Sequence, residues 1–195
     1  MEIVISVLQV VHVINAMLMA WPFYALVAVN QRGILGPPVG DRVDVYMENI
    51  IKNRTVPCFV FQGTALVTGA ALVVLRGKGF SDLITEPVLA LKFFPLLLIG
   101  GLLTYVHLSL QPRIDALFAK TGGAPASPEL AKRIGPLRIF RKRLATACLF
   151  VVLFSALLGM QVWAPFPVWL TALLTTAIAL FTWRAYSSVT PYGWA

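Results

Sequence analysis

Charged residues are scarce in this chain of 195 residues. Asp, Glu, Lys and Arg make up 12% of it, and 58% of the residues are hydrophobic, whereas a soluble domain has about 25% charged residues. This composition excludes an ordinary soluble domain and predicts an integral membrane protein of the all-α class. The net charge of +8 does not predict nucleic-acid binding, because the basic residues lie in loops between apolar runs and not on one folded face.

Cysteine and histidine are also rare, with two of each. Cys58 and Cys148 lie within or at the end of apolar runs, and their spacing does not indicate a zinc site or a disulfide framework. We interpret both as packing residues. His12 and His107 each lie inside an apolar run, where an ionisable group costs free energy unless it faces protein, water or a ligand. The histidines are therefore the first candidates for a functional site.

Five apolar runs are long enough to cross a membrane as helices, which takes about 20 residues each. We expect one domain over residues 1–195, a polytopic helical bundle with spans at 3–29, 56–75, 87–110, 144–162 and 168–183.

Two shorter stretches, at 41–53 and 128–142, carry apolar residues at helical spacing beside charged ones. This pattern predicts amphipathic helices that lie on the membrane surface. The second stretch opens with the Ser-Pro-Glu pattern of a capped helix start at 127–129. We expect an interruption near Gly135 and Pro136, because proline removes a helical hydrogen bond.

Lysine and arginine are divided unevenly between the two sides of this bundle. Thirteen fall in loops on one side, Arg76 and Lys78 fall on the other, and the remaining one is Lys92 inside the third span. By the positive-inside rule the N-terminus is outside and the C-terminus cytoplasmic, which suits a bacterial inner membrane. We expect the basic loops to contact anionic lipid headgroups, with an acidic soluble partner as the alternative for 128–142.

The third span carries the strongest candidate site. Gly100, Thr104 and His107 have i, i+4, i+7 spacing, so two small residues share a helical face with the imidazole. Tyr105 lies beside them and would suit a porphyrin plane. Lys92 precedes His107 by about four turns and lies close to the same side of the helix.

The two histidines suggest a haem site, because neutral imidazole is a common ligand of haem iron. In the first span, Asn15 shares the face of His12. His12 lies nearer the outer surface than His107, so a haem shared by both requires a tilted or shifted span. Otherwise the outer half of the site holds His12 with Lys92, which can pair with a carboxylate. The alternative, that each histidine only hydrogen-bonds a neighbouring helix, stays open.

This layout resembles the HemJ-type protoporphyrinogen oxidases and the related CopD-type membrane proteins. The resemblance rests on the histidine in LQVVHVINAML, on a later span that opens with Lys92 and closes on Tyr105 and His107, and on the basic lead into the next span. It implies a haem b or porphyrin site in a small helical bundle, with His12 as axial ligand and Lys92 as an essential polar partner. This chain differs in its longer Lys92 to His107 spacing, larger loops and fifth span.

We therefore expect a membrane redox protein that binds haem b through His12, His107 or both. Its chemistry would be electron transfer with quinone or porphyrin oxidation, alone or with other membrane subunits. Copper bound with Met19 beside His12, or chlorophyll bound by each histidine, are alternatives within the same class. From another class, a non-catalytic scaffold or accessory subunit of a larger respiratory or photosynthetic complex fits the small size. The sequence leaves open whether the protein is an enzyme.

Overall fold

The fold is given by a computed structural model that describes residues 2–29, 38–52, 55–122, 124–162 and 165–187. Within these ranges every regular element is a helix. Five helical stretches are long and apolar enough to cross a membrane, in agreement with the predicted number of spans. The elements follow one another as α1 (Glu2–Val29), α3 (Arg42–Lys52), α4 (Thr55–Leu75), α5 (Asp82–Thr85), α6 (Pro87–Tyr105), the π-helical turn η1 (Val106–Leu110), α7 (Gln111–Phe118), the 3-10 turn η2 (Ala119–Thr121), α8 (Pro128–Gln161) and α9 (Val168–Ser187).

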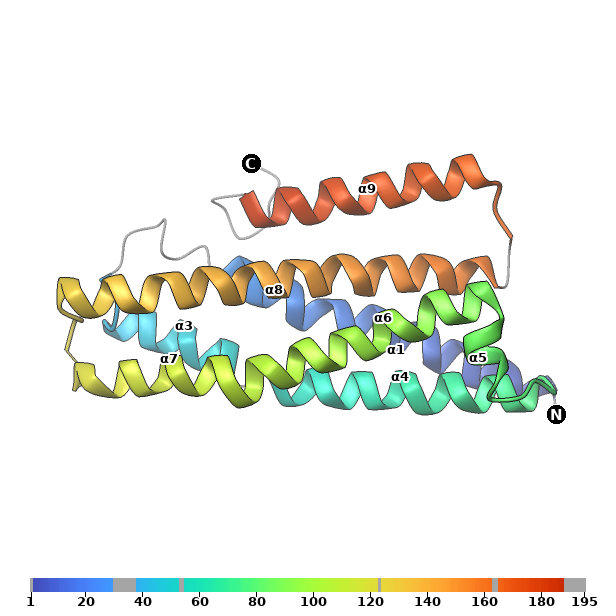
Figure 1. The fold of residues 1–195 in the computed structure, drawn as a ribbon, viewed down its shortest axis with the longest axis horizontal. Helices are drawn as coiled ribbons and strands as arrows, with labels where there is room; N and C mark the ends of the chain where they lie inside the picture. The colour runs from blue at the N-terminus through green and yellow to red at the C-terminus, as the bar shows by residue number, and fades with distance from the viewer. Residues whose placement is uncertain (1, 30–37, 53–54, 123, 163–164, 188–195) are drawn as a thin grey trace.

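The long helices form a bundle in which successive members run in opposite directions (Figure 1). α1 packs along both α4 and α8, α6 packs mainly on α8, and α9 lies along α8 on the outside. α1, α4, α6 and α8 thus surround a common interior. That interior holds the core and the candidate site.

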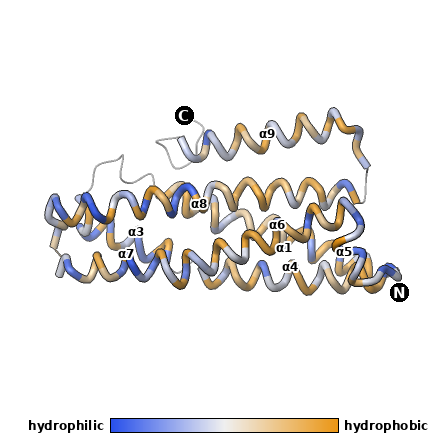
Figure 2. Tube along the Cα trace, in the orientation of Figure 1, coloured by the Kyte–Doolittle hydropathy of each residue, from blue (hydrophilic) through white to orange (hydrophobic). Residues whose placement is uncertain are grey.

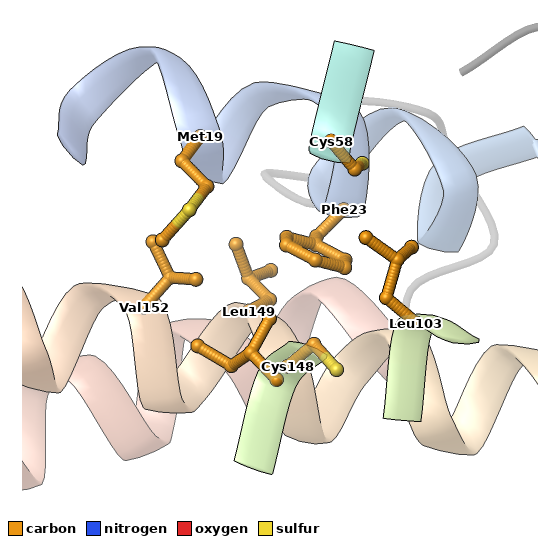
Figure 3. Packing of buried hydrophobic residues seen from close by; sticks show 8 residues of the cluster. Met19, Phe23, Cys58, Leu103, Cys148, Leu149 and Val152 are labelled. Atoms are coloured by element: carbon orange, nitrogen blue, oxygen red, sulfur yellow. The ribbon is translucent and has the colours of Figure 1, made fainter. Parts of the chain in front are cut away.

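An apolar cluster fills the middle of this interior, and Figure 3 shows its side chains pointing toward one another. Cys58 of α4 and Cys148 of α8 belong to it as buried free thiols, which agrees with their interpretation as packing residues. The cluster consists of Met19, Phe23, Cys58, Ile99, Leu103, Cys148, Leu149 and Val152.

The third predicted span, 87–110, is part of a longer helical stretch. α6 ends at Tyr105, but the chain continues through the π turn η1 into α7 without leaving the helical path. Polar residues reappear in α7, yet one face of it stays buried through Gln111 and Ile114. The helix therefore extends past the apolar run, because tertiary contacts continue where hydropathy ends.

The fourth span and the predicted surface helix 128–142 are one helix, α8, of 34 residues. Ser127 caps its start by accepting a hydrogen bond from the Leu130 backbone N–H, as predicted from the sequence. The predicted interruption near Gly135 and Pro136 was wrong, because α8 continues through both residues. Buried side chains on each side of the proline, Ile134 and Arg141, fix the helix against its neighbours.

One end of the bundle is polar, and Figure 2 shows it at α3, α7 and the beginning of α8. α3 forms within the predicted range 41–53. It buries Asp44 and Glu48 against the bundle, whereas Val43 and Tyr46 of its apolar side are exposed. The acids face inward because cationic side chains of α8 bind them there.

Candidate functional site

A cavity of about 400 Å³ lies between α1, α4, α6 and α8. Its walls are mostly apolar, and Met19, Ile99 and Val152 of the core cluster close it toward the middle of the bundle. The connection between α4 and α6 borders its other end. Ligand pockets range from roughly 300 to 1,000 Å³, so the cavity has the size of a small-molecule site.

His12 and Lys92 both line this cavity. His12 comes from α1, and Lys92 comes from the first half of α6. One alternative from the sequence placed these two residues in the same half of a site, and in the structure both line one cavity.

The His12 ring is fixed by a hydrogen bond to α4. Its Nδ1 lies 2.7 Å from the Oγ1 of Thr68. The Thr68 hydroxyl has one hydrogen, which it donates to the Thr64 carbonyl oxygen at 2.6 Å. With that hydrogen on the Thr64 carbonyl, the hydroxyl oxygen accepts from His12, and we assign the proton to Nδ1 and the lone pair to Nε2. This tautomer gives His12 a free metal-ligating or proton-accepting nitrogen, to which no other described residue forms a hydrogen bond.

Gly69, the next residue along α4, gives the His12 ring its space. A Cβ atom at this position would lie 3.3 Å from the ring's Cε1. This is tighter than most side-chain contacts, so a larger residue would displace the imidazole. Thr68 and Gly69 therefore position His12 together, one by binding it and one by leaving it room.

The Lys92 side chain reaches from α6 across to α8. A Cβ atom on Gly159 of α8 would lie 3.4 Å from the Lys92 Nζ. The Lys92 ammonium therefore lies inside the bundle, against Gly159, and does not point away from the helices.

The end of the cavity near the α4–α6 connection is cationic. Arg76 and Lys78 line it, together with Glu86 at the start of α6. Glu86 forms an ion pair with Lys78 through both carboxylate oxygens. Glu86 is the one acid that lines the cavity among the described residues, and because Lys78 binds it, Lys92 has no acidic partner in this lining.

His107 lies outside the cavity. It belongs to the π turn η1, its side chain is exposed, and its ring meets the Phe59 ring edge-on at 5.7 Å between centroids. Thr104 and Tyr105 are also exposed, and the Tyr105 ring contacts Phe140. Thr104 and His107 of the predicted groove thus point outward, and His12 and His107 do not converge on one ligand position.

Asn15 and Gly100 lie inside the bundle and make contacts between helices. The Asn15 side chain donates a hydrogen bond to the Phe61 carbonyl of α4 at 2.7 Å. Gly100 lies against Gln62, whose amide donates to the Leu96 carbonyl of α6 at 2.7 Å. Neither Asn15 nor Gly100 lines the cavity. In this structure both residues join α4 to a neighbouring helix.

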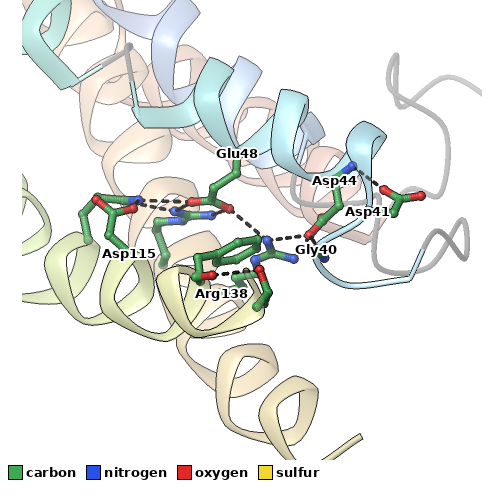
Figure 4. A network of polar contacts seen from close by, with 10 residues as sticks. Gly40, Asp41, Asp44, Glu48, Asp115 and Arg138 are labelled. Atoms are coloured by element: carbon green, nitrogen blue, oxygen red, sulfur yellow. Dashed lines mark hydrogen bonds and ion pairs between the residues drawn. The ribbon is translucent and has the colours of Figure 1, made fainter. Parts of the chain in front are cut away.

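A second polar group, which we call the clasp, joins α3, α7 and α8 at the polar end (Figure 4). The Arg138 guanidinium binds both Asp44 oxygens at 3.0 and 2.9 Å, and Arg141 binds both oxygens of Glu48. Gln111 accepts from Arg141 at 2.6 Å and donates to Glu48 at 3.1 Å. The clasp lies mostly in the interior of the protein, because its side chains are buried except for that of Arg138, which is 12% exposed.

Sequence reasoning found His12 and Lys92 but missed the residues that position them. Thr68, Gly69 and Gly159 lie in apolar runs where small residues commonly serve helix packing. The available signal is the spacing of Cys58, Gln62 and Gly69, which are four and then seven residues apart and so lie near one face of the second span. It indicates a surface that can be closely approached, but it does not identify the approaching side chain.

Comparisons with known proteins give no match to this chain, whether with family models, curated proteins or solved structures.

Proposed function

We propose that this protein is a haem b-binding membrane redox protein whose tetrapyrrole occupies the cavity between α1, α4, α6 and α8. The observation that carries the proposal is the contact of 2.7 Å between the Nδ1 of His12, which lines the cavity, and the Oγ1 of Thr68. Because the hydrogen bond to Thr68 uses Nδ1, the Nε2 of His12 would hold the haem iron.

The residues of the chain have separable roles in this proposal. His12 would bind the iron, Thr68 would hold the imidazole in orientation, and the apolar walls would exclude water from the bound haem. Haem supplies one-electron redox chemistry, and the surrounding residues tune it through burial and charge. Lys92 provides a positive charge in the same cavity.

The cavity is also suited to exchange with the membrane. Its lining includes Met17, Leu66 and Met160, whose side chains are largely exposed on the outer surface of the bundle. Quinones and porphyrins partition into lipid, so a side opening would let either reach the site. This supports electron transfer with quinone or porphyrin oxidation as the reaction, with other membrane subunits as further partners.

We propose an orientation with the N-terminus outside and the C-terminus in the cytoplasm of a bacterial inner membrane. α3, α7 and the start of α8, which carry most of the basic residues, lie at one end of the bundle, whereas Arg76 and Lys78 lie at the other. The basic end would contact anionic headgroups. The cavity then lies in the outer half of the membrane.

The test is the absorbance of the purified protein, with a pyridine haemochrome assay and iron analysis. We expect a Soret band in the wild type, its loss in His12→Ala and its retention in His107→Ala. The histidine variants form a matched pair, because both remove an intramembrane imidazole but only one removes a cavity residue. Absence of haem after reconstitution, or equal effects of the two substitutions, would contradict the proposal. Haem-free protein that purifies with other membrane subunits would favour the scaffold alternative.

A further inference from the structure

The Lys92 ammonium lies in an apolar cavity without an anionic partner. It forms no hydrogen bond or ion pair with any other described residue. Its Nζ lies against Gly159, a residue that offers no polar side chain. An uncompensated charge at membrane depth costs free energy, so such a lysine normally faces a counter-ion or a ligand.

The nearest candidates within the protein do not supply this counter-charge. Glu86 uses both carboxylate oxygens to bind Lys78. Arg76 also lines this end of the cavity, but as a cation it cannot supply the counter-charge for Lys92. The charges of the described residues around the cavity therefore favour an anion that comes with the ligand.

A second unpaired donor lies on the same wall. Ser155 lines the cavity from α8, one turn before Gly159, and its Oγ is buried without a hydrogen-bond partner among the described residues. Buried hydroxyl groups are nearly always hydrogen-bonded, so the Ser155 hydroxyl at the cavity wall is available to a group bound in the cavity. Ser155 and Gly159 are four residues apart and therefore share one face of α8. The Lys92 ammonium, which lies against Gly159, is thus on the same side of α8 as the Ser155 hydroxyl.

We infer that Lys92 and Ser155 form a carboxylate-binding end of the cavity, and that the ligand is an amphiphile with an acidic edge and an apolar body. The inference deepens the proposed function and rests on it for the identity of the ligand, since haem b carries two propionate groups. A fatty acid from the bilayer also combines a carboxylate with an apolar body. Charge-assisted hydrogen bonds from Lys92 would bind the carboxylate in either case.

The first experiment compares haem b with its dimethyl ester, in which both propionates are uncharged, by titration of the purified full-length protein. We expect the wild type to prefer the free acid by roughly tenfold to a hundredfold, the size expected for a hydrogen bond to a charged group. Lys92→Met should abolish this preference, Lys92→Arg should retain most of it, and Ser155→Ala should reduce it. Lys132→Met, on the exposed surface at the far end of the bundle, is the matched control and should change nothing.

The second experiment is independent of haem. A fluorescent long-chain fatty acid and its methyl ester are titrated into the haem-free protein, again with Lys92→Met and Lys132→Met. Lys92-dependent binding of the acid together with failure to bind haem would support the carboxylate end and contradict the proposed function. Equal haem and ester affinities that Lys92→Met leaves unchanged would overturn this inference and leave the haem proposal standing. Thermal unfolding of each variant separates lost binding from lost folding, and Lys92→Arg serves if Lys92→Met does not fold.

Discussion

The Nδ1–H of His12 is donated to the Thr68 hydroxyl, and this single hydrogen bond of 2.7 Å joins α1 to α4 at the wall of the cavity. It also decides the chemistry of the ring, because the Thr68 hydrogen is already donated to the carbonyl of Thr64. The neutral imidazole is thereby held with its lone pair on Nε2. The Thr68 hydroxyl thus has two effects: it joins α1 to α4, and it leaves the Nε2 of His12 as the ring nitrogen that can bind a metal.

Thr68→Val should weaken haem binding. Valine preserves the shape of the side chain but removes the acceptor that orients the ring, and loss of such a partner typically lowers metal affinity by about tenfold to a hundredfold. Thr68→Ser should retain most of the affinity. Haem titration followed at the Soret band measures both. Thr176→Val is the control, because Thr176 hydrogen-bonds only its own helix on the exposed side of α9. Equal affinities of the Val and Ser variants would show that the hydroxyl does not orient the ligand.

Gly69→Val should displace the His12 ring and abolish haem binding without unfolding the protein. The first added carbon would already lie 3.3 Å from Cε1, and the branched side chain of valine adds two more methyl groups. Gly63→Val on the same helix is the matched control, since a Cβ there meets nothing within 4 Å. Absorbance reports binding, and circular dichroism reports helix content. Full haem occupancy in Gly69→Val would mean that haem binding does not require the His12 ring to lie against residue 69.

The spans and part of the site could be predicted from the sequence because they depend on local properties. A run of apolar residues is sufficient to predict a membrane helix, and the Ser-Pro-Glu pattern at 127–129 is sufficient to predict the start of α8. His12 and Lys92 were paired by their expected depth in the membrane. Depth follows from distance along the chain, so it can be read from one sequence.

The rotation of each helix about its axis could not be predicted. α6 is apolar on nearly all sides, so its sequence does not indicate which face meets the bundle. The stripe of Gly100, Thr104 and His107 was therefore expected to face a ligand, whereas Thr104 and His107 face outward. The sequence also did not predict that Asp44 faces inward. Its direction depends on the ion pair with Arg138, which is 94 residues away in the chain, and a local pattern does not show such a partner.

Gly100→Ala should destabilise the protein, whereas Gly101→Ala should not. The added methyl at Gly100 would lie 2.5 Å from the Gln62 amide nitrogen, which would have to leave its hydrogen bond to the Leu96 carbonyl. Overpacking of this kind costs about 1–3 kcal/mol. At the neighbouring Gly101 nothing lies within 4 Å of the added atom. Thermal unfolding in detergent compares the two. A larger loss of stability in Gly101→Ala would contradict the close approach of α4 and α6 at Gly100.

Glu48→Met should be among the most destabilising substitutions at the polar end of the bundle. It would leave Arg141, which is 1% exposed, without its carboxylate, and breaking a buried ion pair costs about 3–5 kcal/mol. The double variant Glu48→Met, Arg141→Met should recover much of this loss, because no uncompensated charge then remains buried.

The matched control for the clasp is the ion pair of Lys52 and Asp115, whose atoms lie 2.8 Å apart with the lysine half exposed. Lys52→Met should cost only about 0–1 kcal/mol, because water screens an exposed pair. Unfolding of the full-length protein, followed by circular dichroism, measures all of these variants. Their haem affinity should stay unchanged, since the clasp lies at the opposite end of the bundle from the α4–α6 connection that borders the cavity. A double variant no more stable than Glu48→Met would mean that side-chain packing, and not the buried charge, sets the cost.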